Sequence, residues 1–436
     1  MKKISANILV LLALLPGNAA AQTLGTLIGT ALQNNYQIAV LRNEARIAAN
    51  NNTAGNAGQL PSAELNGTYS TSGNNTLQVF ADGTRREGSN AGNSSINISA
   101  LANWTAFDGF RVYARKDQLN YLEELGQLNA RFYIEQSVAD IAATYYELLY
   151  EKRLLRHLGH SLNISAFRLG IELKKKEIGS GTMISYGQAV VDHQTDSILL
   201  LAQQNRIEGL EIELKRVVNL GIREALTIAD TAFDFLLLPE RDSLVYGVKQ
   251  HNSQLDRQRL VELIAETRLR EEQANRYPRV DLFAGYQYVR STSEVGFFQS
   301  NQNYGPTAGV SVNFNLFRGG EVNRNIRNAA IENENARLLL QQVGTDLEAE
   351  VHALYGQYLS VQERMALARK NVVRSRQVYA AAEQQLRQGA INGYDFRLTQ
   401  LSLLNAELSL VQLEYSLKLL EISLNRMSGR VLEKYL

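Results

Sequence analysis

Apolar and polar residues alternate with a period of two in four stretches of this chain. The clearest reads GVSVNFNLFRGG, residues 309–320, where every second residue from Val310 to Leu316 is apolar. Such alternation predicts a β-strand with one apolar and one polar face. Strands are predicted in this way at residues 63–70, 96–104, 280–289 and 307–317.

Helical periodicity fills most of the remaining chain, which contains only 5 prolines to interrupt it. Helices are predicted at residues 24–57, 111–177, 184–218, 242–275, 321–387 and 394–427. At 1.5 Å per residue the two longest would be about 100 Å long, which is typical of coiled arrays rather than of globular domains.

The last predicted helix carries two apolar seams on nearly opposite sides. One runs from Tyr394 to Ile422 and the other from Phe396 to Leu424, with spacings of three and four residues. Such seams pack against neighbouring helices, so the helix is predicted to stand in a wall with a neighbour on each side. A fully buried bundle helix is the alternative. Four polar residues argue against this alternative, because both surfaces of a helical wall are in contact with water: Asn405, Glu407, Gln412 and Glu414.

Similar segments occur twice along the chain. The offset is 217 residues up to the first strand of each copy and 210 from the second strand onwards, as between Gly179 and Gly389. An offset that changes only in a loop indicates an internal duplication. The predicted organisation is a first repeat at 22–239, a second at 240–428 and a tail at 429–436. Each repeat reads helix, strand, strand, long helix, turn, helix.

The four strands could belong to a membrane-spanning sheet, since each has about the nine to eleven residues that a tilted strand needs to cross a bilayer. Aromatic residues at the strand ends suit a membrane interface: Trp104, Phe107, Phe314 and Phe317. The joining loops, residues 73–92 and 290–305, are predicted to be long and polar. A small sheet packed on helices in a soluble domain would alternate equally well.

Four strands leave two open edges, and unpaired edges cannot lie in lipid. Closure must therefore come from further copies of the chain around a rotation axis. Two copies would supply eight strands and a filled interior, and three would supply twelve and a lumen.

Composition narrows the possible classes of function. The 436 residues carry a formal net charge of +1, which gives no sign of nucleic-acid binding, and the absence of cysteine excludes disulfides and Cys-ligated metals. Residues 1–21 are predicted to be a secretory signal, because Lys2 and Lys3 precede an apolar core and an Ala-rich cleavage site. The mature chain is then expected to be soluble outside the cytoplasm or to span a membrane by strands.

No arrangement typical of an enzyme is evident, and no cofactor or metal is predicted. His157 and His160 are spaced like metal ligands on a helix, but no carboxylate cluster accompanies them. Lys174, Lys175 and Lys176 precede a turn and are interpreted as a solvated helix tip that could also meet a protein partner. Catalytic triads and paired catalytic carboxylates are not recognisable.

These features together resemble the TolC family of outer-membrane export ducts. The local markers are the prolines that precede strands, Pro61 and Pro278, the LFRGG segment before a long helix, and GAINGYDFRLTQLSLLNAEL at 389–408. The resemblance implies a homotrimer with a twelve-stranded barrel in outer-membrane lipid and a helical tunnel in the periplasm. It also implies two protein partners, a periplasmic adaptor and an inner-membrane transporter.

The resemblance also suggests site residues. Asp395 matches the first of the family's gate aspartates, whereas the second falls on Leu398, and the latching arginine and tyrosine fall on Ile391 and Leu386. A ring of three Asp395 carboxylates would favour cations. Asp395 could equally complement a helix dipole.

Two glycines mark the ends of the long helices. The turns at Gly179 and Gly389 resemble the tips that adaptors grip in the family, although each glycine could simply cap a helix. The predicted function is a passive, gated outer-membrane channel for efflux or type I secretion. A periplasmic coiled-coil scaffold and a stand-alone porin are the alternatives.

Overall fold

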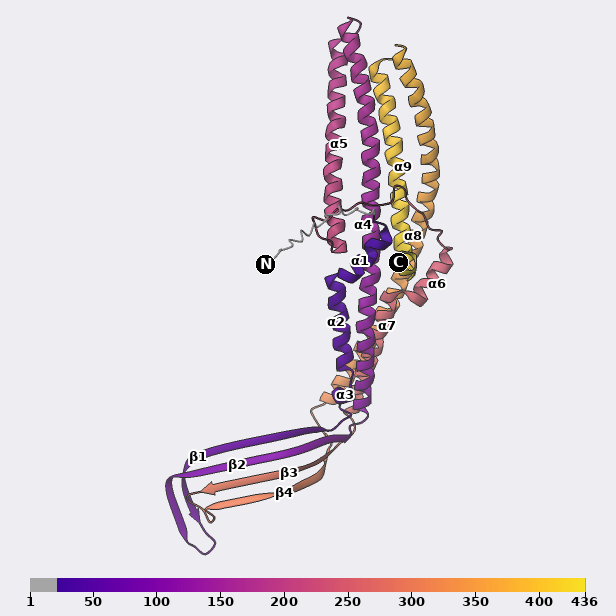
Figure 1. Cartoon of the computed structure of the whole chain (residues 1–436). Helices are drawn as coiled ribbons and strands as arrows, with labels where there is room; N and C mark the ends of the chain where they lie inside the picture. The colour runs from indigo at the N-terminus through magenta and orange to yellow at the C-terminus, as the bar shows by residue number, and fades with distance from the viewer. Residues whose placement is uncertain (1–21, 436) are drawn as a thin grey trace, which may run out of the picture. The chain divides into compact units, whose positions relative to one another are not determined.

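The computed structural model describes residues 22–435, so the predicted signal, residues 1–21, lies outside the described residues (Figure 1). The described chain divides into two compact units, each built from segments of both repeats. We call residues 39–131 and 253–345 the sheet unit. We call residues 22–38, 132–252 and 346–435 the helical unit. The repeat boundaries at 239 and 428 remain a proposal.

The sheet unit holds all four predicted strands in one antiparallel sheet of order β1-β2-β3-β4. The strands are β1 (Ser62–Val79), β2 (Arg85–Phe107), β3 (Arg279–Ser293) and β4 (Ser300–Asn313). Helices α3 (Ala54–Ala57) and α7 (Ser253–Ala274) and most of α2 (Tyr36–Asn51) also belong to this unit. The beginnings of α4 (Arg111–Glu177) and α8 (Glu321–Arg387) complete it.

The pairing of the strands confirms the predicted faces. Leu65 lies opposite Ala100, and Ala100 lies opposite Tyr286, so one apolar row crosses from β1 to β3. The polar residues Asn66 and Ser99, which are the sequence neighbours of Leu65 and Ala100, are paired in the same way. Because partners in register point to the same side, the four strands share one apolar face and one polar face.

The prediction of two long joining loops, at residues 73–92 and 290–305, is wrong. Most of each segment continues the strands, with Val79 paired to Arg85 and Thr292 paired to Ser300, so only short turns remain. Backbone hydrogen bonds extend the ladder wherever a partner strand is present, even when both faces are polar. Alternation of apolar residues cannot reveal such a strand.

The fourth predicted strand was drawn too long, because β4 ends at Asn313 and the segment from Phe314 to Phe317 follows it. The partner of Asn313 is Arg279, the first residue of β3. Pro278 precedes it and has no backbone N–H to extend the ladder. The pairing therefore stops at this level.

The helical unit contains the remaining long helices. It includes α1 (Leu24–Asn34), α5 (Met183–Val218), α6 (Arg241–His251), α9 (Gly393–Met427) and α10 (Val431–Tyr435), with the ends of α4 and α8. Its core joins Leu27 and Ile28 of α1 to Ile141 and Leu148 of α4 and Leu214 of α5. The bounds predicted for α4 and α8 are confirmed, and each has 67 residues.

The helices predicted at 24–57 and 242–275 are broken in the structure at Asn35 and Asn252 respectively, and the first is interrupted again between Asn51 and Ala54. The Asn35 side chain accepts hydrogen bonds from the backbone N–H groups of Gln37 and Ile38, which caps the next helix. The Asn252 side chain donates to the Met427 carbonyl. Asparagine competes for backbone hydrogen bonds in this way, and the break recurs at matching positions of the two repeats.

The turns that lead into the long helices also preserve the duplication. Gly109 and Phe110 have φ values of 72° and 68°, and the matching Gly319 and Gly320 have 56° and 77°. A side chain on Gly109 would meet the Ala274 carbonyl at 2.7 Å, so this position needs glycine for space as well as for conformation. Among residues 22–435, no helix combines the length and apolar character needed to cross a membrane.

Candidate functional site: helical tips and sheet faces

The two turns of the helical unit have the same capping geometry. At the first, Gly179 has φ 73° and the Ser180 N–H donates to the Lys175 carbonyl at 2.9 Å. At the second, Gly389 has φ 72° and the Ala390 N–H donates to the Gln385 carbonyl at 2.9 Å. These are Schellman caps, which need a residue that tolerates the left-handed conformation. Both glycines are exposed and therefore accessible to a partner.

Asp395 lies in the first turn of α9 and is exposed. Its backbone N–H donates to the side-chain oxygen of Asn392 at 2.8 Å, so Asn392 is the helix N-cap. The carboxylate complements the positive end of the helix dipole. In the first repeat, Thr182 caps α5 in the same way and Ser185 stands where Asp395 stands. Of these two matching positions, only the one in the second tip therefore carries a carboxylate.

The positions aligned with the family's latch are inside the helical unit. Leu386 is fully buried and Ile391 is half-buried, and both pack with Ile164 and Phe396. These apolar side chains hold the turn onto the ends of the helices. They leave no hydrogen-bonding group for a polar latch at these two positions.

The expectation that Glu407 and Glu414 are exposed to water on the surface of a helical wall is wrong. Their exposed fractions are only 5% and 8%, whereas Asn405 and Gln412 are exposed as expected. The reason is charge pairing across helices. Glu407 meets the His157 ring nitrogen at 2.8 Å and Arg376 at 2.7 Å.

Glu414 is paired in the same way, with Arg153 at 2.5 Å from the facing helix α4. Nearer the tips, Arg397 makes a two-pronged ion pair with the buried Asp196 of α5, at 2.7 and 2.8 Å. Gln400 donates to Ser161 of α4. Carboxylates buried within a helical bundle require such partners, so this stripe of α9 ties together the hairpins of the two repeats.

His157 is therefore engaged with a carboxylate, and His160 is exposed on the surface. Among residues 22–435, no three histidine, aspartate or glutamate side chains gather as metal ligands would. The pair His157 and Glu407 lies 250 residues apart in the chain, and no local spacing could have revealed it.

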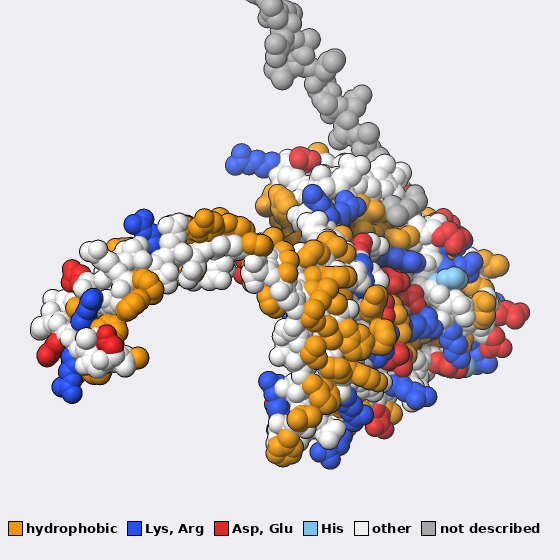
Figure 2. All heavy atoms as spheres, turned by 90° about the horizontal axis from the view of Figure 1, so that it is seen from below, with side chains coloured by type: hydrophobic (Ala, Val, Ile, Leu, Met, Phe, Trp, Pro, Cys, Tyr) orange, Lys and Arg blue, Asp and Glu red, His pale blue; other side chains and the backbone are white. Residues whose placement is uncertain are grey.

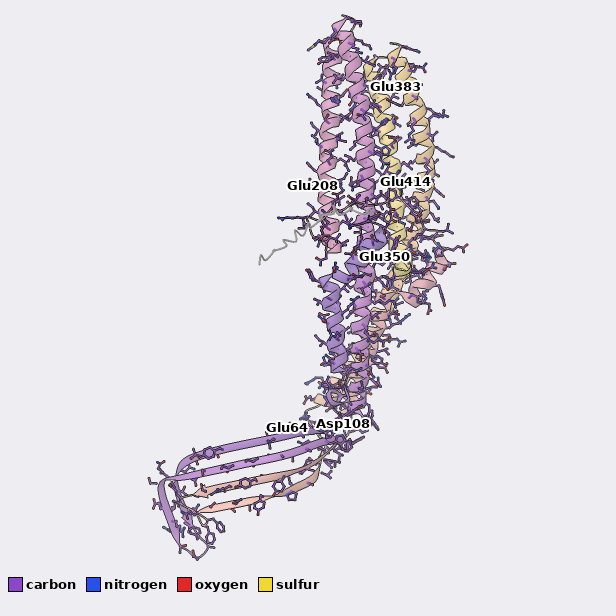
Figure 3. The ribbon with its side chains drawn as sticks, viewed as in Figure 1. Glu64, Asp108, Glu208, Glu350, Glu383 and Glu414 are labelled. Carbon is purple, nitrogen blue, oxygen red and sulfur yellow. The ribbon has the colours of Figure 1, made fainter. Side chains whose placement is uncertain are left out.

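The sheet has a band without charge. On β3, the eight residues between Asp281 and Arg290 are uncharged, which is about 26 Å along the strand at roughly 3.3 Å per residue. Glu64 lies near the start of β1, and β1 has no further charge (Figure 3). β4 has none at all. In Figure 2 the sheet is the arm at the left, and charged side chains gather towards its far end.

Aromatic side chains lie at both ends of this band. At the end nearer the helices, the Trp104 indole donates to the Gln59 carbonyl at 3.0 Å and Phe107 packs edge-on against Phe110 at 5.6 Å. Phe314 and Phe317 are exposed in the segment after β4. At the other end, three tyrosines that were not predicted as interface residues lie on the apolar face: Tyr69, Tyr288 and Tyr304.

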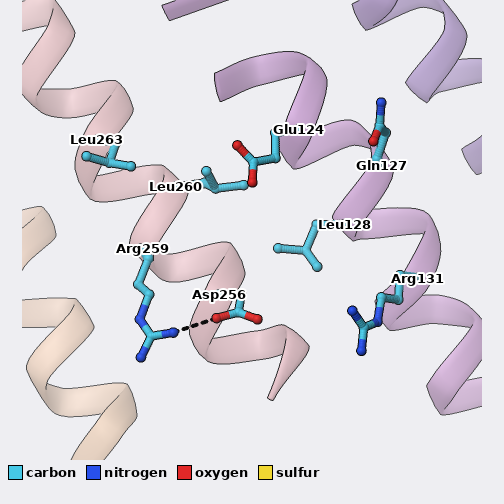
Figure 4. Close-up of a pocket in the computed structure, with 8 residues that line it drawn as sticks. All are labelled: Glu124, Gln127, Leu128, Arg131, Asp256, Arg259, Leu260 and Leu263. Atoms are coloured by element: carbon cyan, nitrogen blue, oxygen red, sulfur yellow. Dashed lines mark hydrogen bonds and ion pairs between the residues drawn. The ribbon is translucent and has the colours of Figure 1, made fainter. Parts of the chain in front are cut away.

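A cleft of about 500 Å³ lies between α4 and α7 in the sheet unit (Figure 4). Its charged lining residues are Glu124, Arg131, Asp256 and Arg259, with Asp256 and Arg259 paired at 2.6 Å. The sequence reasoning did not single it out. Its charges are of both signs and it contains no nucleophile with an adjacent base, so the arrangement does not suit catalysis.

Known proteins resemble this chain mainly in structure. CusC is 16% identical with a TM-score of 0.79, over 94% of this chain and 92% of CusC. VceC from Vibrio cholerae is 18% identical with a TM-score of 0.75, over 93% and 96%. The outer membrane channel MtrE from Neisseria gonorrhoeae is 14% identical with a TM-score of 0.73, over 94% and 89%. None of the curated protein sequences matches significantly.

The duplicated chain, with its four-stranded sheet and its two 67-residue helices, has the channel-tunnel fold of these outer-membrane proteins. Residues 244–430 match the family model described as outer membrane efflux protein. Within that segment, the resemblance predicted from the sequence is confirmed.

Proposed function

We propose that three copies of the chain form the outer-membrane exit duct of a tripartite efflux pump or a type I secretion system. The observation that supports this proposal is the sheet, which has one apolar face with an uncharged band and two open edges, β1 and β4. In lipid every backbone polar group must be hydrogen-bonded. The β4 edge of one copy must therefore pair with the β1 edge of the next.

The faces of the sheet then acquire separate roles. The face with Leu65, Ala100 and Tyr286 meets lipid, and the face with Asn66 and Ser99 meets water. The aromatic side chains at the two ends of the uncharged band lie at the two membrane interfaces, as in other outer-membrane strands. Three copies supply twelve strands and leave a lumen, whereas two supply eight and leave none.

The helical unit lies in the periplasm, where its tips meet an adaptor that is joined to an inner-membrane transporter. No residue cluster in the described chain suits catalysis, and the chain acts as a passive conduit, driven by the transporter. The exposed Asp395 carboxylates of three copies form the gate and favour cations. The aligned apolar residues Ile391 and Leu386 make any latch of this gate apolar.

Fractionation and conductance test the proposal together. The chain should be recovered from outer membranes only with detergent, cross-link as a trimer, and form pores of low conductance in planar bilayers until a partner opens them. Recovery from the periplasm without detergent would contradict a membrane location. Wide conductance from the purified chain alone would favour a stand-alone porin.

A further inference from the structure

The two helical tips have the same backbone but different side chains. Three large apolar side chains are exposed at the first tip, with exposed fractions of 77% for Ile178, 66% for Met183 and 84% for Ile184. The matching residues of the second tip are Gln388, Gly393 and Tyr394. Exposed apolar side chains gathered at one turn are typical of a contact surface. Backbone geometry cannot account for the difference, because the two caps are alike.

The two tips also differ in charge, and again the first tip has the distinctive side chains. The last turn of α4 carries Lys174, Lys175 and Lys176, whereas the matching residues of α8 are Gln384, Gln385 and Leu386. Both helices end with equivalent dipoles, so the dipole alone does not explain three lysines at one end only. The last turn of α8 has a single cation, Arg387, which is paired with Glu383 at 2.7 Å.

The three lysines differ in their contacts. Lys175 lies 3.5 Å from the buried carboxylate of Glu172, and the Lys176 ammonium lies 4.4 Å from the centre of the Tyr186 ring. Lys174 is exposed, and within residues 22–435 its ammonium forms no ion pair or hydrogen bond. Two of the three ammonium groups therefore lie close to fixed neighbours. The third is available to an approaching carboxylate.

We propose that the first-repeat tip, formed by Lys174, Lys176, Ile178, Met183 and Ile184, is the principal docking surface for the periplasmic adaptor. The part of the adaptor that binds there carries apolar side chains flanked by carboxylates, because only these complement the tip in both character and charge. The second-repeat tip makes the weaker contact. Three copies then offer three strong and three weak positions. This inference rests on the proposed function.

An anionic lipid surface would also attract lysines and apolar side chains. Such attraction contributes about 1 kcal/mol per lysine and falls off within a Debye length of the membrane. Three lysines on one turn give only weak binding without a fixed orientation. Lys176, held over the Tyr186 ring, suits an oriented protein contact better.

Cross-linking in cells identifies the partner. A photoreactive amino acid is placed at position 178 of the full chain, and in a separate variant at position 388. We expect strong cross-links from 178 to an adaptor peptide rich in Asp or Glu, and weaker ones from 388. Equal yields from the two positions, or a cross-linked peptide without acidic residues, would overturn the inference.

Binding of that purified adaptor to the full-length channel in nanodiscs then measures the two tips. The double variant Lys174→Glu, Lys176→Glu should weaken binding at least tenfold at low salt and less at high salt. The variant Ile178→Ser, Met183→Ser should weaken it at any salt concentration. Gln384→Glu with Gln388→Ser is the matched change at the second tip and should have a much smaller effect. All six positions are exposed, and an unchanged trimer and conductance confirm folding.

The outcomes separate the two proposals. Replacing the cross-linked carboxylates of the adaptor by lysine should restore binding to the Lys174→Glu, Lys176→Glu channel. Adaptor binding that survives the changes at the first tip would overturn this inference alone, as would equal losses at the two tips. Binding of the first tip to phosphatidylglycerol vesicles in place of the adaptor would also overturn it. If the unaltered channel binds no adaptor, the proposed function fails as well.

Discussion

At the scale of single residues, Asp395 carries the proposed selectivity of the channel. It is exposed in the first turn of α9, and the first repeat has Ser185 at the matching position. Asp395→Asn keeps the shape of the side chain and removes its charge, so the preference for cations in planar bilayers should fall several-fold. Ser185→Asn is the matched control and should leave ion selectivity unchanged. Equal selectivity of the Asp395→Asn and unaltered channels would remove Asp395 from the gate.

Glu407 gives the helical unit a stability that depends on pH. Burial opposes its charge, but hydrogen bonds from His157 and Arg376 outweigh burial and lower the pKa of the Glu407 carboxyl below its ordinary value of 4.5. The stabilisation is therefore present above about pH 4.5 and is lost as pH falls through the lowered pKa. Glu407→Gln should lower the free energy of unfolding by about 1–3 kcal/mol at pH 7.

Chemical unfolding in detergent at pH 7 and at pH 3 checks this expectation. The difference between Glu407→Gln and the unaltered chain should narrow at pH 3. Glu383→Gln alters a carboxylate that contacts Tyr379 and forms a partly exposed pair with Arg387, and it should cost about 0.5 kcal/mol or less. An equal loss at both pH values for Glu407→Gln would show that its charge does not contribute.

The residues found by sequence reasoning were those with a local signature. Gly179 and Gly389 were found because a capping glycine follows a long periodic helix. Asp395 was found because it matches an aspartate of the family that the sequence resembles. The burial of Glu407 and Glu414 was missed because their partners His157 and Arg153 lie more than 240 residues away in the sequence. Pairing at that distance depends on the antiparallel register of the helices, which periodicity does not fix.

At the scale of elements, the capped turns should tolerate side chains poorly. Gly389 has φ 72°, where an alanine costs about 1–2 kcal/mol. Gly389→Ala should therefore lower thermal stability. Gly356 lies in an exposed part of α8 with free space around it, and Gly356→Ala should raise stability by up to about 1 kcal/mol. A Gly389→Ala channel as stable as the unaltered one would contradict the role given to the cap.

The strands show what alternation can and cannot predict. It identified the apolar face wherever one face is apolar, as from Val280 to Tyr288. It failed from Asn74 to Val79 and from Asn301 to Asn303, where the strands continue with little or no apolar alternation. It also predicted a strand that continues past Asn313, because the apolar pattern persists beyond the point where the neighbouring strand β3 begins. Strand length is set by the neighbouring backbone rather than by the side chains.

At the scale of the whole molecule, the open edges couple membrane insertion to assembly. In a single copy, the outward backbone groups of β1 and β4 are unpaired, and each such group costs several kcal/mol in lipid. One copy alone should therefore not insert stably. Pairing β4 of one copy with β1 of the next removes this cost for every copy, provided that the ring closes.

Cysteine pairs placed on the edge strands test this closure, because the chain contains no cysteine of its own. Asn66→Cys on β1 is combined in turn with Asn301→Cys, Asn303→Cys or Thr307→Cys on the same face of β4. One register should give disulfides between copies and a ladder that ends at three chains on denaturing gels. Asn66→Cys with Gln287→Cys is the control, since β2 separates these strands within a copy and β4 would separate them between copies.

The length of the ladder decides the architecture. A ladder that stops at two chains would indicate a closed eight-stranded sheet without a lumen, and the channel would need another path. Absence of any cross-link in all registers would show that the edges do not meet. A ladder of three, formed only in outer-membrane fractions, would establish that the uncharged face, the open edges and the tyrosine and tryptophan ends act as one membrane-spanning assembly. Insertion and assembly should then fail together when β4 carries a proline at Val310, which removes a ladder hydrogen bond from the apolar part of that strand, opposite Leu282.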